Sequence, residues 1–213
     1  MTEIPLILKL KKKIHKDIAV AHDVIIKELY TVFGRAVLHG GTSIWRCYNG
    51  NRFSEDVDVY LLRDEKKLND FFDGLKKKGF KTTKRKTTEN SLFSSLDFKG
   101  VKVRFEVLFK NMEKNAVLRG YELSNGNVMT IYTLSPEDLI KEKIGAYLNR
   151  FKIRDLYDLF FLLRYVDKNK IQREIDNLIK NFKKPIDEKD LDALIIEGIV
   201  PSVDKMMDYI NKG

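Results

Sequence analysis

Two aspartates, one residue apart, are the side chains in this chain best placed to do chemistry. Asp56 and Asp58 open the apolar run "DVDVYLL". On a β-strand, residues i and i+2 project from the same face, so both carboxylates would lie close enough to share one cation. Burying two like charges together is unfavourable unless a cation lies between them. Oxygen ligands of this kind suit Mg²⁺, or Mn²⁺, which also binds substrate phosphates and water.

A third carboxylate is available in the segment "VKVRFEVLF". Glu106 alternates with Phe105 and Val107 and so faces the polar side of the expected strand. On a neighbouring strand it would complete a phosphoryl-transfer site that can hold two ions. Two simpler alternatives stay open. Asp-x-Asp pairs also occur at strand ends without a metal, and Glu106 can be a surface cross-strand partner of a lysine.

Two glycines precede the aspartates at a junction that the sequence predicts to run from strand to helix. Gly40 and Gly41 would let backbone amides approach a ligand. Thr42 and Ser43 follow at the expected helix start, where a hydroxyl and the field of the helix N-terminus favour a phosphate. A Gly-Gly pair alone is usually only a turn. Its position before Asp56 and Asp58 makes phosphate binding the better interpretation.

The elements that must position these residues follow from hydrophobic periodicity. Residues 5 to 33 have apolar positions at helical spacing and predict one long amphipathic helix. "RAVLH" predicts a short buried strand, and a helix is expected from about Thr42 to Tyr48. The aspartates then begin a central strand. The stripe expected to face the core consists of Ile14, Ile18, Ala21, Ile25 and Leu29.

The middle of the chain predicts a further helix and several more strands. "EKKLNDFFDGLKKKG" has a helical pattern with a basic last turn and a glycine after it. Turns are expected at Lys99-Gly100 and at Asn125-Gly126, each between two strand-like segments.

The pattern changes at Ser135, and only helices are expected beyond it. "SPEDLIKEKIGAYLNR" begins with a capping Ser, Pro at the first helical position and acids in the first turn. Interruptions are expected near Lys168, Pro185 and Pro201. The predicted fold class is therefore α+β. A small mixed β-sheet domain with flanking helices covers residues 1–133, and a helical domain covers residues 134–213.

Composition limits the chemistry and the partners. Among 213 residues there is one cysteine, Cys47, so neither a disulfide framework nor a cysteine zinc site can form within the chain. A net charge of +9 favours a polyanionic partner such as nucleic acid or nucleotide phosphates, although a merely solvated lysine-rich surface is the alternative. No apolar run is long enough for a membrane span or a signal peptide, and we expect no membrane partner and a cytoplasmic location.

Two segments resemble the signatures of a known family. "GGTSIW" followed by "RFSEDVDVYL", and "EKIGAYLNRFKIRDLYDLFFLL" further on, resemble the nucleotidyltransferase-like toxins of the abortive-infection AbiEii/AbiGii type, within the DNA polymerase β-like nucleotidyltransferase superfamily. The two segments lie between Gly40 and Leu163 and occur in the order that the family has. The resemblance implies that the α/β domain has the nucleotidyltransferase fold.

The resemblance also implies roles for individual residues. Asp56 and Asp58 match the family's metal-binding pair, with Glu106 as the candidate third ligand. The same pair and three residues of the second signature, Lys143, Asp155 and Asp158, are the predicted catalytic residues. The residues expected to bind the nucleotide are Gly40, Gly41, Thr42, Ser43, Arg52, Ser54, Lys143 and Arg154. For Asp155 and Asp158 the alternative is stabilisation of a helix N-terminus, and for Lys143 it is simple solvation.

The function implied is metal-dependent transfer of a nucleoside monophosphate from a nucleoside triphosphate (NTP) to an acceptor. The resemblance further implies a toxin of a toxin–antitoxin or phage-defence pair with a cognate antitoxin, and tRNA as the expected acceptor. The segment "LKKKGFKTTKRKTTEN" contains seven cations that suit contact with an RNA backbone, or else form a solvated surface. Two alternatives are a non-catalytic protein of the same fold, which binds nucleotide, RNA or antitoxin, and a transferase whose acceptor is a protein.

Overall fold

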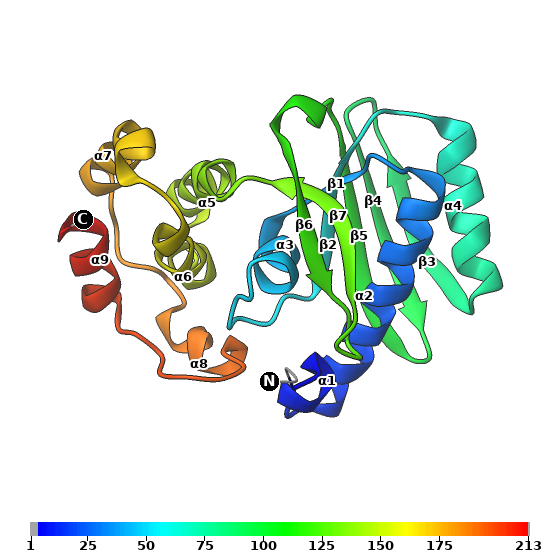
Figure 1. The fold of residues 1–213 in the computed structure, drawn as a ribbon, viewed down its shortest axis with the longest axis horizontal. Helices are drawn as coiled ribbons and strands as arrows, with labels where there is room; N and C mark the ends of the chain where they lie inside the picture. The colour runs from blue at the N-terminus through cyan, green and yellow to red at the C-terminus, as the bar shows by residue number, and fades with distance from the viewer. Residues whose placement is uncertain (1–3, 213) are drawn as a thin grey trace. The chain divides into compact units, whose positions relative to one another are not determined.

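A seven-stranded mixed sheet organises the first half of the chain (Figure 1). Parallel pairing joins β2 to β5 and β1 to β7, and the other neighbours are antiparallel. Strands β3 and β6 are the two edges. In sheet order the strands are β3 (Phe80–Thr87), β4 (Ser91–Phe98), β5 (Val101–Phe109), β2 (Asp56–Leu61), β1 (Val37–His39), β7 (Val128–Leu134) and β6 (Ala116–Glu122).

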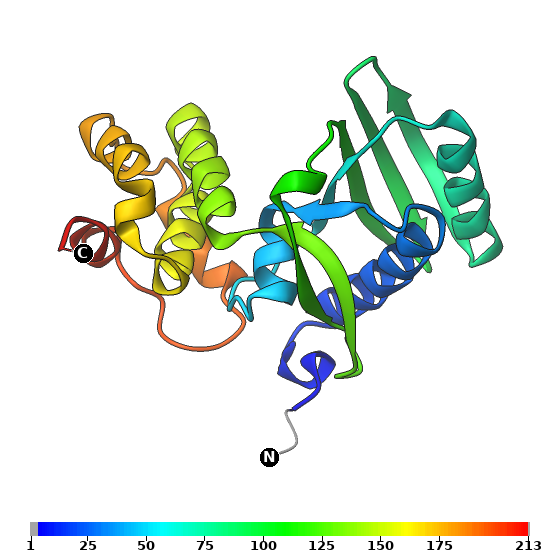
Figure 2. The ribbon, with the colours of Figure 1, turned by 45° about the horizontal axis from the view of Figure 1, so that its top comes forward.

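Helices flank this sheet, and the longest of them is amphipathic. Helix α2 packs against α4 and β5, and α4 packs against β3, so the two helices lie side by side along the sheet (Figure 2). The core between them and the sheet is built largely from apolar side chains and includes Ile25, Leu29, Phe71 and Phe105. The helices of this part are α1 (Leu6–Lys9), α2 (Lys13–Val32), α3 (Gly40–Cys47), α4 (Glu65–Lys77) and the short 3₁₀ helix η1 (Glu113–Asn115).

The N-terminal helix differs from the sequence prediction in one respect. Residues 5 to 33 form two helices, because Leu10 adopts an extended backbone and buries its side chain between them. Ile14 then falls in the first turn of α2 and is 47% exposed, so its assignment to the core stripe was wrong. The stripe begins at Ile18 instead and continues as predicted.

Both predicted turns are present, and each has a glycine with a positive φ angle. Lys99 has φ 52° and Gly100 has φ 86°, and together they join β4 to β5. This two-residue turn with both φ values positive matches the right-handed twist of the paired strands. Gly126, with φ 88°, lies in the turn between β6 and β7.

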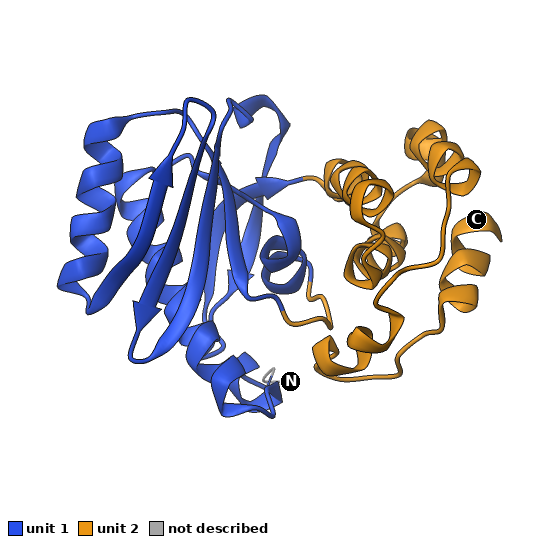
Figure 3. Cartoon of the chain, turned by 180° about the vertical axis from the view of Figure 1, so that it is seen from behind, with its two compact units in different colours: residues 1–48, 54–134 blue, residues 49–53, 135–213 orange. Residues whose placement is uncertain are grey.

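The computed structural model describes residues 4–212, which fall into two compact units (Figure 3). One contains the described residues up to Tyr48 together with Ser54–Leu134, and the other contains Asn49–Phe53 together with the described residues from Ser135 on. The segment Asn49–Phe53 joins the helical unit through its backbone. Phe53 donates its N–H to the Leu194 carbonyl at 2.8 Å, and the Asn51 carbonyl accepts from Ile196 at 2.8 Å.

The helical unit begins with the predicted cap. The Ser135 hydroxyl accepts the N–H of Asp138 at 3.1 Å, and Pro136 occupies the first turn of α5. Helix α5 packs against α6 and α7, and α6 packs against α9. The elements of this unit are α5 (Pro136–Arg150), α6 (Ile153–Leu162), η2 (Leu163–Tyr165), η3 (Lys168–Ile171), α7 (Gln172–Lys180), η4 (Glu188–Asp190), α8 (Leu191–Leu194) and α9 (Val203–Lys212). Within residues 4–212, no helix has the length and apolar character needed to cross a membrane.

A buried histidine in α2 makes the stability of the sheet unit depend on pH. His22 is inaccessible to solvent, and its Nε2 lies 3.1 Å from the Glu55 carbonyl. Burial, followed by the positive charge of Arg46, lowers the pKa of His22 from 6.5 to about 3. The unfolded chain therefore takes up this proton at higher pH than the folded protein does. Stability from this group is complete above pH 6.5 and declines as the pH falls toward 3.

We expect the free energy of unfolding to fall by about 1.4 kcal/mol for each pH unit below 6.5 because of this one group. Urea unfolding between pH 7.5 and 4.5 measures the slope. In His22→Gln, which keeps an N–H donor but cannot take up this proton, the slope should be smaller by that amount. Equal slopes in the two proteins would show that His22 does not control the acid sensitivity.

Candidate active site

The two aspartates share one face of strand β2, as the alternation predicts. Val57 and Val59 between and after them are completely buried, whereas Asp56 and Asp58 are half-buried. A strand with apolar residues on one side and carboxylates on the other must present both carboxylates to the same surface. The predicted shared face is therefore confirmed.

The neighbouring strand adds the third carboxylate at the expected place. Strands β2 and β5 are parallel and in register, with Asp58 beside Glu106 and Asp56 beside Arg104. Burial raises the pKa of Glu106, and the negative charges of Asp58 and Asp56 raise it further. Three carboxylates thus repel one another at this position, which is the electrostatic situation that a bound cation relieves.

A cationic side chain of the protein, that of Arg104, already lies beside these carboxylates. The Arg104 guanidinium donates from Nε and Nη2 to the two oxygens of Asp56, both at 2.6 Å. In this conformation the part of the chain that the structure describes has no three His, Cys, Asp or Glu side chains converging on one point that could hold an ion. The carboxylates are therefore neighbours, and only a rearrangement of their side chains would let all three reach a common ion.

The glycine pair meets the aspartates at the end of β1. His39 is the register partner of Asp58, and Gly40 directly follows it. The Asp58 carboxylate packs against Gly40 so closely that a Cβ added there would lie 2.5 Å from its Oδ2. Gly40 also has φ +70°, which side chains disfavour. Both the close approach and the backbone conformation thus require glycine at this position.

The hydroxyls of the next two residues are used inside the protein. Thr42 and Ser43 are completely buried. Thr42 donates to the carbonyl of Asp56, and Ser43 bonds to Thr133, which itself donates to the Leu38 carbonyl at 2.7 Å. These bonds hold the first turn of α3 against β2 and β7. The predicted phosphate contacts of the two hydroxyls stay a prediction, whereas their role in positioning α3 beside Asp56 is evident.

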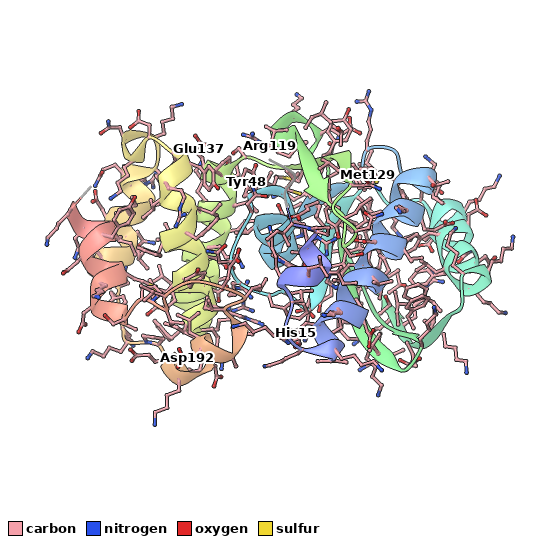
Figure 4. The ribbon with its side chains drawn as sticks, turned by 60° about the horizontal axis from the view of Figure 1, so that its bottom comes forward. His15, Tyr48, Arg119, Met129, Glu137 and Asp192 are labelled. Atoms are coloured by element: carbon pink, nitrogen blue, oxygen red, sulfur yellow. The ribbon has the colours of Figure 1, made fainter. Side chains whose placement is uncertain are left out.

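The other end of α3 is fixed by aromatic and cationic side chains. Tyr48 donates its hydroxyl to the Leu134 carbonyl at 2.6 Å, and the Arg119 guanidinium lies 5.3 Å from the centre of its ring (Figure 4). Arg46 is buried between the rings of Trp45 and Tyr121 and forms an ion pair with Asp23. Helix α3 is therefore held at both ends, which keeps its N-terminus at the end of the central strand β1.

The second signature forms a buried ion network within the helical unit. Arg52 donates from Nε and Nη2 to the two oxygens of Asp158, each at 2.7 Å. Lys143 lies 2.7 Å from Asp158 and 3.4 Å from Asp155, and Arg150 binds Asp155 at 2.7 and 2.9 Å. Three cations and two carboxylates thus alternate along one network.

The pKa shifts of Asp158 and Arg52 indicate that the ion pairs of this network outweigh the effect of burial. Asp155 and Asp158 are at most 1% exposed. Burial by itself raises the pKa of Asp158, but Arg52 and Lys143 outweigh it, and the net shift is downward. Burial opposes the charge of Arg52 as well, and pairing with Asp158 nevertheless raises its pKa. Asp158 and Arg52 therefore stay ionised inside the unit.

Two further predicted residues are near these groups along the chain. Ser54 is buried at the start of the segment that leads into β2, and Arg154 is half-buried in the first turn of α6. Sequence reasoning missed Arg104 and Arg150 as participants. A signal for Arg104 was present, since it lies two residues before Glu106 and so shares its face of the strand. For Arg150 only its position in the last turn of α5, five residues before Asp155, gave an indication.

The fold has solved relatives of low sequence identity. JHP933 from Helicobacter pylori is 19% identical, with a TM-score of 0.61, and the similarity covers 90% of this chain and 88% of that one. A second H. pylori structure, assigned as a nucleotidyltransferase, has the same identity and TM-score and covers 90% and 91%. No curated protein matches the chain. The family model described as "Nucleotidyl transferase AbiEii toxin, Type IV TA system" matches residues 28–207, and the chain belongs to this family of nucleotidyltransferase toxins.

Proposed function

We propose that this nucleotidyltransferase transfers a nucleoside monophosphate from an NTP to RNA in a reaction that depends on Mg²⁺ or Mn²⁺, with tRNA as the acceptor. The observation that supports the proposal best is the meeting of Asp56, Asp58, Glu106 and Gly40 on the central strands β2 and β5 and at the end of β1. A structural role would not require three mutually repelling carboxylates beside a close glycine contact. The family's description also implies an antitoxin as a partner.

The carboxylates would hold the cation, and the α3 N-terminus would hold the phosphates. Asp56, Asp58 and Glu106 are hard oxygen donors of the type that Mg²⁺ prefers. When bound, the cation supplies charge stabilisation for the transferring phosphoryl group. Gly40 and Gly41 present backbone amides at the start of an eight-residue helix, where the helix field favours an anion. Together these groups would align the triphosphate for attack by the acceptor hydroxyl.

For the second signature the structure supports a different emphasis. Lys143, Asp155 and Asp158 form ion pairs with each other and with Arg52 and Arg150, and they are almost completely buried. We propose that their first role is to fix α5, α6 and the segment that leads into β2. The catalytic and phosphate-binding roles implied for these residues and for Arg154 are the competing hypothesis, and hydrogen exchange in Asp158→Asn separates the two.

RNA as the acceptor is supported by the exposed edge strand β3. After the buried Phe80, all residues of β3 are exposed. Arg85 lies 4.3 Å from the ring centre of Phe72, and Lys84 lies 5.3 Å from that of Phe93. Packing on rings orders these cations while their charge stays accessible. Cations along an exposed edge strand can contact a phosphate backbone.

The decisive test of the transferase function uses each labelled NTP in turn. The full-length protein is incubated with Mg²⁺ and total cellular RNA, and RNA and protein are then resolved on gels. We expect label in a tRNA-sized band with one NTP preferred. Label in protein instead of RNA would change the acceptor class. No label with any NTP, despite nucleotide binding, would favour the non-catalytic alternative.

Neutralising four lysines of the basic segment that runs from the end of α4 through β3 is expected to weaken RNA binding without affecting NTP binding. In a variant with Lys77, Lys81, Lys84 and Lys86 changed to Gln, RNA affinity at low salt should fall by about 10- to 100-fold. The slope of log affinity against log salt should become shallower by about 0.7 for each lost contact. Binding assays across a salt titration measure both. The matched control changes Lys170, Lys180, Lys183 and Lys184, and equal effects of the two variants would mean that only overall charge matters.

A further inference from the structure

The ion pair between Arg104 and Asp56 differs in geometry from an ordinary surface salt bridge. The two residues are register partners on adjacent parallel strands, so the backbone itself places them side by side. Both oxygens of Asp56 accept from Arg104, each at 2.6 Å. A carboxylate engaged through both oxygens has its strongest acceptor directions occupied. The same oxygens are the ones that a divalent cation would need.

The position of the pair relative to the other carboxylates gives it a function. Arg104 lies two residues before Glu106 on β5, and Asp56 lies two residues before Asp58 on β2. One guanidinium therefore lies at the border of a group of three carboxylates and offsets part of their mutual repulsion. In the absence of a metal, Arg104 supplies a positive charge at this position from the chain itself.

The ion pair between Arg104 and Asp56 can also dissociate easily. The side chain of Arg104 is 47% exposed and that of Asp56 is 19% exposed. Ion pairs that are accessible to solvent stabilise a protein little, so releasing Arg104 costs little. A long side chain at the protein surface can rotate into solvent without disturbing the core. On this strand the core residues include Val103, Phe105 and Val107.

We propose that Arg104 is an internal counter-cation that competes with the divalent cation for Asp56 and that binds the nucleotide phosphates once it is displaced. This inference rests on the metal site of the proposed function. The planar guanidinium forms bidentate hydrogen bonds with phosphate as well as with carboxylate. An arriving triphosphate therefore removes Arg104 from Asp56 and brings the cation with it. Metal and nucleotide then bind with positive coupling, and neither binds strongly alone.

The test measures Mn²⁺ affinity by electron paramagnetic resonance and needs no turnover. Without nucleotide, Arg104→Gln should bind Mn²⁺ about three- to fivefold more tightly than the wild type, because the competitor is gone. A non-hydrolysable NTP analogue should tighten Mn²⁺ binding in the wild type by a larger factor than in Arg104→Gln. The matched control is Arg63→Gln, which removes a guanidinium of similar exposure from its pair with Glu65. That control should behave like the wild type.

Two further variants separate the possible failures. Asp58→Asn defines the site, since Mn²⁺ binding that survives in it lies elsewhere. Arg104→Lys keeps the charge without the fork and should fall between the wild type and Arg104→Gln, which checks that loss of folding is not the cause. If the wild type binds Mn²⁺ at this site and Arg104→Gln binds it equally or more weakly, the counter-cation role is wrong. If no protein binds Mn²⁺ even with the NTP analogue, the proposed metal site fails, and the counter-cation role fails with it.

Discussion

Replacing Asp58 by Asn is expected to reduce nucleotide transfer by about 10³-fold or more while the protein remains folded. Asn keeps the size of the side chain but removes the charge on which a cation would depend. Asp58 is chosen because Arg104 binds both oxygens of Asp56, and replacing Asp56 would release that guanidinium. Single-turnover transfer assays with saturating NTP and Mg²⁺ measure the effect on chemistry.

The stability of the same variant distinguishes a functional from a structural carboxylate. Asp58 and Asp56 both raise the pKa of Glu106, which reports repulsion among the three carboxylates. Removing one of these charges should leave the metal-free protein at least as stable as the wild type in urea unfolding. Asp73→Asn on the exposed surface of α4 is the matched control and should change neither property. A destabilised Asp58→Asn protein with near-normal transfer would show that the residue supports the fold and not the reaction.

The part of the site that could be predicted from the sequence depends on local periodicity. A two-residue alternation places Asp56 and Asp58 on one face and predicts the face of Glu106, and the register of β2 with β5 then makes them neighbours. The close backbone approach at Gly40 could be predicted, because the conformational freedom of glycine is a property of the residue itself. Hairpins at Lys99-Gly100 and Asn125-Gly126 follow from the same kind of local signal.

Other parts could not be predicted, because they depend on which distant segments meet. Strand alternation placed Arg104 on the polar face, but only the strand register shows that its partner is Asp56. The pairing of Arg52 with Asp158 joins segments 106 residues apart. The hydrogen-bond partners of the buried Thr42 and Ser43 hydroxyls could not be predicted either. A hydroxyl that can bind a phosphate can equally bind a protein carbonyl or hydroxyl. The helix break at Leu10 arises because tertiary burial overrides a continuous helical pattern.

The buried ion network gives the second large expected effect. Asp158→Asn removes the carboxylate that Arg52 and Lys143 share and leaves both cations buried. Breaking a buried pair in this way typically destabilises a protein by about 3–5 kcal/mol, because the remaining charge cannot be solvated. Asp155 cannot compensate, since it already binds Arg150 and contacts Lys143. We therefore expect the helical unit to open far more often in the variant.

Hydrogen exchange followed by mass spectrometry can locate that effect. Amides of α5, α6 and residues 49–53 should exchange about 100-fold faster or more in Asp158→Asn, because local opening becomes more frequent. The matched control is Asp138→Asn on α5, which removes a carboxylate from the more exposed pair with Lys141 and should change exchange little. A catalytic Asp158 would behave in the opposite way, with unchanged exchange in the helical unit and a large loss of transfer.

Since Arg52 lies only four residues before Asp56, weaker anchoring of residues 49–53 should also disturb the start of β2. In that case the transfer rate declines in proportion to the local opening. It recovers at temperatures or osmolyte concentrations that restore protection of the amides from exchange. If Asp158 were catalytic, stabilising the fold would not restore transfer.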